Sequence, residues 1–276
     1  MPTITLPRIA EDFTARVTAV EPLLFLTRDS GLQREAIAAL EQLVAELEGY
    51  RAAAAAKRAE TEANILLGLR TAANGLIEEL RVYLLLKAED PDKAWDALVR
   101  SQAAFAAAMR AHASFAYLAA KADHLRALER YMFPPIQFVS AGLIVREQVC
   151  SICRADYSAC DHLAGRPYCG QFCAVILKQV EPDHIALVDE PANRHCRITA
   201  IGTATGRRNV MTWRVTRSKA GDTPYVEGQL IADSIIATTS DFGRESADGA
   251  EVPTPVGAVE QTEAKETSDG DQGRQE

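Results

Sequence analysis

The sequence predicts an α+β protein, with an N-terminal antiparallel helical bundle in residues 1–132 and a small β-rich domain in residues 133–238. In the first segment, apolar side chains recur three, four and seven positions apart, which is the period of amphipathic helices. The second segment contains short β-branched runs separated by glycines, a pattern typical of strands and turns. Phe133-Pro134-Pro135 marks the change, because proline cannot continue a helix.

Three helical stretches are expected in the first segment. One ends near Pro22 and carries Ile9, Phe13, Val17 and Val20. The next begins at a capping box of Ser30 and Gln33, and its apolar stripe covers residues 40–83. Three glycines weaken the case for one unbroken helix there: Gly49, Gly68 and Gly75. The last stretch begins at Asp90-Pro91, with Asp at the N-cap and Pro at the first helical position, and continues to Phe133.

The β-rich segment is expected to hold several short strands around one long loop. The runs with strand-like composition are residues 136–145, 174–180, 185–188, 197–201 and 211–216. The loop between the first two runs carries most of the cysteines of the chain. A cluster of cysteine side chains in this loop is therefore expected to stabilise the domain, in addition to its hydrophobic core.

Four soft metal ligands lie in that loop at the spacing C-x2-C-x6-C-x-H. They are Cys150, Cys153, Cys160 and His162, a set of three cysteines and one histidine that suits a closed tetrahedral zinc site. All six cysteines fall between Cys150 and Cys196, which in a cytosolic protein favours metal binding over disulfides. The sequence thus predicts one structural Zn2+. Cys169 and Cys173 follow closely, and either of them is an alternative to His162 as fourth ligand or a small packed residue.

The chain also resembles a known family between residues 138 and 193. The resemblance rests on Phe138-Val139-Ser140-Ala141-Gly142-Leu143, on the cysteine loop, and on Glu181-Pro182-Asp183-His184-Ile185-Ala186-Leu187-Val188-Asp189-Glu190-Pro191-Ala192-Asn193. These segments are similar to the C-terminal half of tailed-phage prohead (capsid maturation) serine proteases and their zinc-knuckle relatives. The resemblance implies an assemblin-like β fold, with Ser140 at the nucleophile position and Glu181 at the acidic position.

The family takes its catalytic histidine from a β-rich segment before the serine, and here that segment has helical periodicity. A serine without a general base is a poor nucleophile. The expected function is therefore a non-catalytic or vestigial assembly or interaction protein of phage-like origin, with self-association or a protein partner through the helices. The first alternative is a serine peptidase in which a partner completes the site of Ser140.

The second alternative is a zinc-containing adaptor that binds nucleic acid. Guanidinium groups pair with phosphates and an indole stacks on a base. The candidates form a basic stretch of residues without an intervening acid: Arg194, Arg197, Arg207, Arg208, Trp213, Arg214 and Arg217.

Charge and hydropathy place further limits on the chain. Its net charge is −8, but residues 241–276 hold ten acids and three bases, so most of the acidity belongs to the C-terminal tail. This composition cannot bury enough apolar surface to offset ordering entropy, and residues 239–276 are expected to be disordered. No apolar run approaches the length of about 18 residues that a membrane helix needs, so a cytoplasmic protein without membrane contact is expected.

Overall fold

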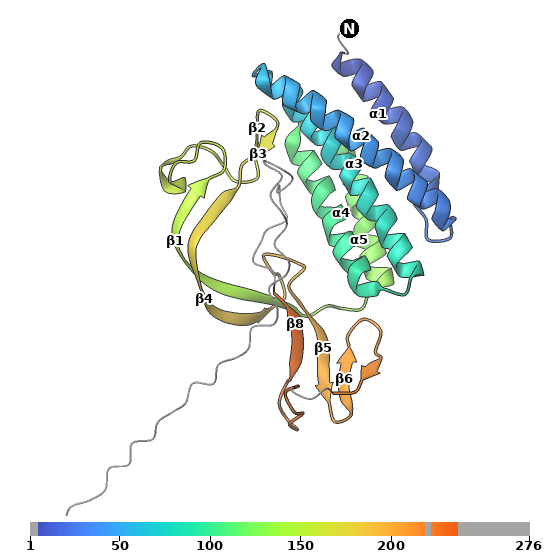
Figure 1. Ribbon diagram of the computed structural model, residues 1–276, viewed down its shortest axis with the longest axis vertical. Helices are drawn as coiled ribbons and strands as arrows, with labels where there is room; N and C mark the ends of the chain where they lie inside the picture. The colour runs from blue at the N-terminus through green and yellow to red at the C-terminus, as the bar shows by residue number, and fades with distance from the viewer. Residues whose placement is uncertain (1–4, 219–221, 237–276) are drawn as a thin grey trace, which may run out of the picture. The chain divides into compact units, whose positions relative to one another are not determined.

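The computed structural model describes residues 5–218 and 222–236 of the chain, and it has the predicted α+β architecture. Five α-helices come first and an antiparallel sheet follows (Figure 1). The helices and strands pack into one compact unit. The last helix ends at Met132, where the sequence placed the boundary between bundle and β domain. The acidic segment expected to be disordered, residues 239–276, lies outside the described residues.

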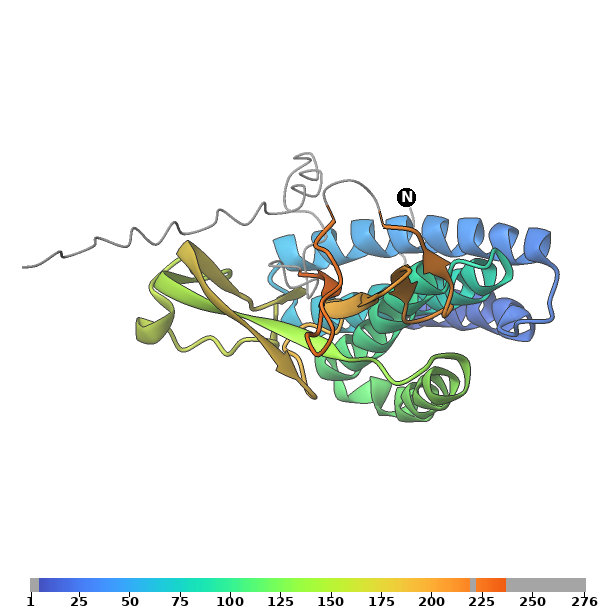
Figure 2. The same ribbon diagram turned by 90° about the horizontal axis from the view of Figure 1, so that it is seen from below.

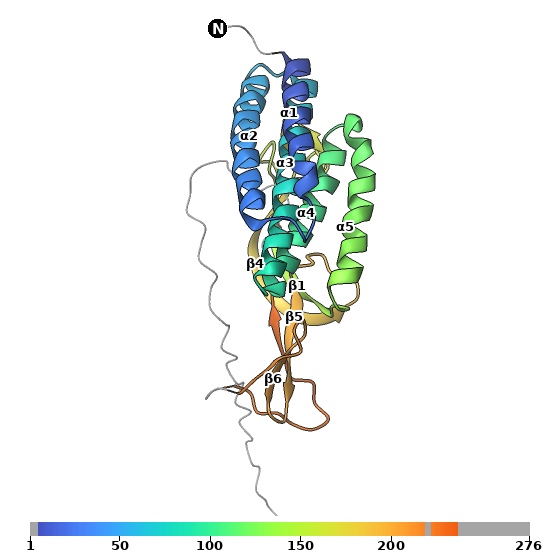
Figure 3. The same ribbon diagram turned by 90° about the vertical axis from the view of Figure 1, so that its right-hand side faces the viewer.

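The helical layer is built from consecutive antiparallel neighbours. Its helices are α1 (Leu6–Val20), α2 (Ser30–Ala56), α3 (Glu60–Lys87), α4 (Pro91–Ala111) and α5 (Ala119–Met132). Connections of three residues join α2 to α3 and α3 to α4, and such short links leave adjacent helices side by side (Figure 3). The large side chains with at most 1 % exposure include Leu40, Leu47, Leu66, Leu80, Leu98 and Phe105. The apolar stripes of the sequence are thus largely buried within the bundle itself.

The helix ends differ from the sequence prediction in three places. Asp29, and not Ser30, caps α2, because its Oδ1 accepts a hydrogen bond of 3.0 Å from the Leu32 N–H. Gln33 is fully buried and donates instead to the carbonyls of Leu23 and Phe25. The long stripe breaks at Arg58, which adopts φ 56°, and not at a glycine. The stretch predicted as one helix after Asp90 also breaks, at His112, into α4, a short 3-10 segment (Ala113–Leu118) and α5.

Two of the glycines in α3 make room for aromatic rings. A Cβ at Gly68 would lie 2.2 Å from Phe115 Cε2, and a Cβ at Gly75 would lie 2.9 Å from Phe105 Cε2. Helices α2 and α3 both remain continuous through their glycines. Gly68 and Gly75 therefore allow close packing of α3 against its neighbours instead of ending a helix.

The sheet is dominated by a long hairpin of β1 (Phe138–Cys150) and β4 (Val175–Val188). The other strands are β5 (Arg197–Thr203), β6 (Gly206–Asn209), β7 (Val215–Thr216) and β8 (Ala232–Ile235), in the order β4-β1-β5-β6-β7 with β8 paired to β5. Figure 2 shows the two long strands of the hairpin, in yellow-green and ochre, side by side. A second, two-stranded sheet contains β2 (Pro167–Tyr168) and β3 (Gln171–Phe172). It belongs to the loop that joins the two long strands.

Two strand predictions need correction. The runs 174–180 and 185–188 are parts of one strand, since β4 continues through Pro182, and the register shifts opposite Gly142 and Leu143. A bulge of this kind absorbs an extra residue without ending the strand. In the predicted strand 211–216 only Val215 and Thr216 are extended in β7, because Asn209 Oδ1 accepts from the N–H groups of Met211 and Thr212 and forms a turn.

Hydrogen bonds anchor the β region to the helices at both ends of the hairpin. Near its base, the fully buried Arg197 donates to Asp96 Oδ1 of α4 at 2.6 Å and to the Asp92 carbonyl at 3.0 Å. At the far end, Arg51 of α2 donates to the Gly170 carbonyl at 2.8 Å, and the Gly170 N–H donates to Asn64 Oδ1 of α3 at 2.7 Å. The loop that carries the cysteines is therefore attached to the bundle.

Candidate metal centre

The first half of the candidate metal centre is a tight turn at the end of β1. Cys150 is the last residue of the strand, and its carbonyl accepts a hydrogen bond of 3.0 Å from the Arg154 N–H. Its sulfur lies 3.4 Å from the Ile152 nitrogen. Arg154 adopts φ 63°, which reverses the chain directly after Cys153. This turn presents Cys150 and Cys153 on one side, as a C-x2-C knuckle requires.

The second half comes from the loop after a short 3-10 turn, Tyr157–Ala159. Asp156 caps this turn through the Ser158 N–H at 2.8 Å, and Cys160 follows it directly. The His162 N–H lies 3.3 Å from the Cys160 sulfur, and its ring packs edge-on against Tyr168, with centroids 4.6 Å apart. The short spacing of Cys160 and His162 therefore brings both ligand atoms to the same point.

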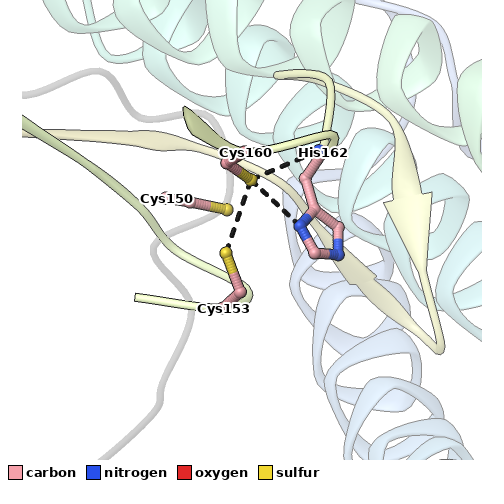
Figure 4. A group of neighbouring side chains, drawn as sticks. All are labelled: Cys150, Cys153, Cys160 and His162. Atoms are coloured by element: carbon pink, nitrogen blue, oxygen red, sulfur yellow. Dashed lines mark hydrogen bonds between the residues drawn. The ribbon is translucent and has the colours of Figure 1, made fainter. Parts of the chain in front are cut away.

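The four predicted ligands converge. Their donor atoms all lie within 4.8 Å of one another (Figure 4). The sulfurs of Cys153 and Cys160 are 3.4 Å apart, and His162 Nδ1 lies 3.1 Å from the Cys160 sulfur. Three thiols and an imidazole can hold a divalent ion such as zinc, and four protein donors leave no coordination position for a substrate. Such a set of donors suits a structural site and not a catalytic one.

The thiol of Cys150 has a lowered pKa. Burial raises the pKa of this thiol, but hydrogen bonds from the backbone N–H groups of Cys153 and Ile152, and from the thiols of Cys160 and Cys153, lower it to about 6. A lowered pKa favours the thiolate, which is the form that ligates metals. Cys150 is fully buried whereas Cys153 is exposed, so the centre lies at the edge of the folded region.

The remaining cysteines divide into three environments. Cys169 packs against the helical core, with its sulfur 3.7 Å from the Ala55 carbonyl oxygen. Cys196 belongs to a small apolar cluster with Val139 and Ile198. Cys173 is buried as the sequence suggested, but its sulfur lies 3.8 Å from that of Cys150. The sequence left Cys173 open as an alternative fourth ligand or a small packed residue, and the structure places it both in a buried position and beside Cys150.

The structure does not bring Ser140 and Glu181 together. Ser140 pairs with Ala186 across the hairpin, while Glu181 pairs with Ile144, four residues farther along β1. At a rise of about 3.3 Å per residue this offset is roughly 13 Å. Glu181 forms an exposed ion pair with Arg146 at 3.0 Å.

His184 lies in β4 of the hairpin, opposite Gly142, and His195 lies just before β5; the imidazole of each pairs with a carboxylate. His184 Nδ1 lies 3.0 Å from Asp183 Oδ2, and His195 Nδ1 lies 3.0 Å from Asp96 Oδ1. Within residues 5–218 and 222–236, the Ser140 hydroxyl makes no hydrogen bond to a histidine. His112 and His124 belong to the bundle, where His124 Nε2 approaches the buried Glu79 at 3.7 Å.

The basic stretch does not form one continuous surface. Arg194 bonds to Gln102 and Glu129 of the helices, and Arg197 is buried against Asp96. Arg207 is 3.7 Å from Asp233, and Arg214 is 3.3 Å from Glu89. The members that remain exposed are Arg208, Trp213, Arg214 and Arg217, with the Arg208 guanidinium 5.7 Å from the centroid of the Trp213 ring. Nucleic-acid contact through these four residues stays a prediction.

Sequence reasoning missed the network of Asp92, Asp96, His195 and Arg197 that joins α4 to β5. Asp92 and Asp96 lie four residues apart, so they share one face of α4. That spacing is the only local signal of the network.

None of the helices in the described part of the chain has the length and hydropathy that a membrane span requires. Comparisons of the chain with protein-family models, curated proteins and solved structures gave no match.

Proposed function

We propose that this chain is a non-catalytic assembly protein that self-associates through its sheet, with a structural zinc ion holding the β1–β4 hairpin against the helices. The observation that carries this proposal is an apolar strip on the outer face of the hairpin, made of the exposed Ile185 and Leu187 with the half-buried Ala141, which no other described residue covers completely. Ile185 is 62 % exposed and Leu187 is 55 % exposed. A contiguous exposed apolar strip of this kind is typical of protein contact surfaces.

The register of the hairpin defines this outer face. Leu187 pairs with Val139, and Ile185 pairs with Ala141. Residues directly opposite in an antiparallel pair share a face, as do residues two apart on one strand. Phe138 points to the other face, where its ring lies 6.1 Å from that of Trp95 in α4. The strip therefore lies on the face away from the bundle, next to the small cluster of Val139, Cys196 and Ile198.

The non-catalytic part of the proposal rests on the surroundings of Ser140. Its hydroxyl has no imidazole as a hydrogen-bond partner within the described residues, and Glu181 is paired with Arg146. General-base activation needs a base within about 3.2 Å or one bridging water of the hydroxyl. A peptidase completed by a partner chain remains the alternative.

Association through the helices is the second candidate for the contact surface. Most side chains of the predicted apolar stripes are buried in the core of the helical bundle, but Phe25, Leu26 and Leu32 stay exposed around the start of α2. Phe25 is 54 % exposed, close to the value of Leu187. The two residues therefore make a matched pair for separating the two surfaces.

Leu187→Asp is expected to weaken self-association by about tenfold or more. Each of the two copies would then place one carboxylate in a contact that excludes water. Sedimentation equilibrium of the purified wild type and variant measures the effect. Phe25→Asp is the matched control and should leave the association constant unchanged, while circular dichroism checks that both variants fold. A wild type that stays monomeric would contradict the proposal, and loss of association in Phe25→Asp alone would move the contact to the helices.

A further inference from the structure

We propose that Cys173 is a reserve ligand of the metal centre, able to replace His162 on an ion that Cys150, Cys153 and Cys160 hold. This inference rests on the zinc site of the proposed function and concerns the identity of its fourth donor. The Cys173 sulfur lies 3.8 Å from the Cys150 sulfur. Two thiolates at about 2.3 Å from one tetrahedral zinc are separated by roughly 3.8 Å, so the pair already has the spacing of two ligands of one ion.

The backbone fixes Cys173 beside the knuckle. Its N–H donates to the Arg166 carbonyl at 2.9 Å, and its carbonyl accepts from the Gly165 N–H at 2.8 Å. The next residue, Ala174, donates its N–H to Ser151 Oγ at 2.8 Å, and its carbonyl accepts from the Ser151 N–H at 2.9 Å. Four hydrogen bonds thus hold the chain at 173–174 between the two parts of the cysteine loop. Cys173 is 2 % exposed, so its thiol is confined to this position.

His162 is held less firmly. It lies on the loop between Cys160 and β2, outside any strand pairing. The neighbouring amides of Leu163 and Ala164 donate to the hydroxyls of Tyr168 and Tyr157, at 2.9 Å and 3.0 Å. The ring itself is half-buried and contacts the edge of Tyr168. The His162 N–H also approaches the Cys160 sulfur at 3.3 Å, and the Leu163 carbonyl accepts from the Arg166 N–H at 3.1 Å. Within the described residues His162 itself makes no backbone-to-backbone hydrogen bond whereas Cys173 makes two, so His162 is the donor that can leave.

The geometry also indicates replacement and not a fifth simultaneous bond. The set of donors that all lie within 4.8 Å of one another includes His162 but not Cys173. Structural zinc is almost always four-coordinate, so one donor leaves as the other binds. In the exchange Cys173 would give its thiol proton to the His162 imidazole as that ring is released, and the Cys173 thiolate would take the place of the ring on the ion. The step needs no oxidant, and it changes a centre of three thiolates and one imidazole into a centre of four thiolates.

Cobalt substitution of the full-length chain tests the exchange. The variants are His162→Ala, Cys173→Ala and the double variant, with competition against a chelating dye giving the affinity for zinc. We expect each single variant to keep one ion, with its affinity for zinc reduced less than about tenfold. The double variant should lose more affinity than the product of the two single losses. The sulfur-to-cobalt charge-transfer absorption should be about one third stronger in His162→Ala than in Cys173→Ala, because four thiolates replace three.

Loss of the ion in His162→Ala would overturn the inference, since Cys173 would then be only a packed residue. Loss of the ion in Cys173→Ala, together with an unchanged metal affinity of His162→Ala, would overturn the inference too. The centre would then be a fixed site of four cysteines. Both results leave the structural zinc site of the proposed function intact. Failure of the wild type to bind cobalt or zinc at all would instead refute that site, so the two failures can be distinguished.

Discussion

Asp96→Ala is expected to be among the most destabilising single substitutions in the chain, lowering the free energy of unfolding by about 3 kcal/mol. Arg197 is fully buried, and Asp96 accepts its shortest hydrogen bond, at 2.6 Å. Asp92 Oδ1 is farther away, at 3.6 Å, and cannot replace that bond without movement. The substitution therefore leaves the buried Arg197 guanidinium without a carboxylate at hydrogen-bond distance, and it also removes one partner of His195.

Urea unfolding followed by circular dichroism measures this effect. Glu89→Ala is the matched control, because it removes another ion pair between the helical and β regions, Glu89 with Arg214, whose side chains are 76 % and 77 % exposed. Exposed pairs of this kind contribute at most about 1 kcal/mol, so the control should unfold almost as the wild type does. Equal stability of Asp96→Ala and Glu89→Ala would contradict the assigned role of Arg197.

The titration of Asp96 predicts how the stability of the protein depends on pH. Burial raises the pKa of Asp96, but the hydrogen bond with His195 and the charge of Arg197 outweigh burial and bring the net value below its ordinary 3.8. Because the folded pKa is lower than the unfolded one, the stabilisation is present above pH 3.8 and is lost as pH falls through the folded pKa. The difference in stability between wild type and Asp96→Ala should therefore narrow at acid pH.

Removing the metal is expected to have the second large effect on folding, and this effect should be confined to the loop between β1 and β4. Chelation, or the substitution Cys153→Ser, should release the loop between β1 and β4 while the helices stay folded. Binding of structural zinc in small finger peptides is worth about 10–16 kcal/mol, and that free energy is gained only when the ligands are brought together. The contacts of Gly170 with Arg51 and Asn64 depend on the folded loop and should be lost with it.

Amide hydrogen exchange can locate this effect. Residues 150–174 are expected to lose protection in the chelated protein and in Cys153→Ser, with little change in the buried parts of α3 and α4. Cys169→Ser is the control, since that sulfur packs against Ala55 of α2 and lies outside the ligand set. Unchanged protection of residues 150–174 after metal removal would contradict the structural role of the ion. Simultaneous loss of protection in the bundle would contradict its local character.

Local chemistry made much of this fold predictable. The C-x2-C-x6-C-x-H spacing identified four candidate ligands whose donor atoms do converge, since a knuckle and a short Cys-x-His step need few other contacts. Asp90 and Pro91 marked the start of α4 correctly, because Asp90 Oδ1 accepts from the Lys93 N–H. By contrast, the pairing of Arg197 with Asp96 spans 101 positions, and no periodicity within either element encodes such a partner.

The failures have similar physical causes. The sequence predicted two separate strands at 174–180 and 185–188, yet β4 continues through Pro182 because the bulge opposite Gly142 accommodates the irregularity. The helix break at Arg58 lies in a segment without glycine or proline, so composition did not mark it. The sequence left Cys173 open as a fourth ligand or a small packed residue, and only the backbone pairing of Ala174 with Ser151 placed it beside Cys150. Each of these features depends on tertiary contacts between segments.

The metal content of freshly purified, reduced protein tests the central claim most directly. Elemental analysis should find one zinc per chain in the wild type and a marked loss of zinc in Cys150→Ser, whose side chain lies at the buried side of the centre. A wild type that contains no zinc, and that takes up none when zinc is added to the reduced chain, would contradict the account.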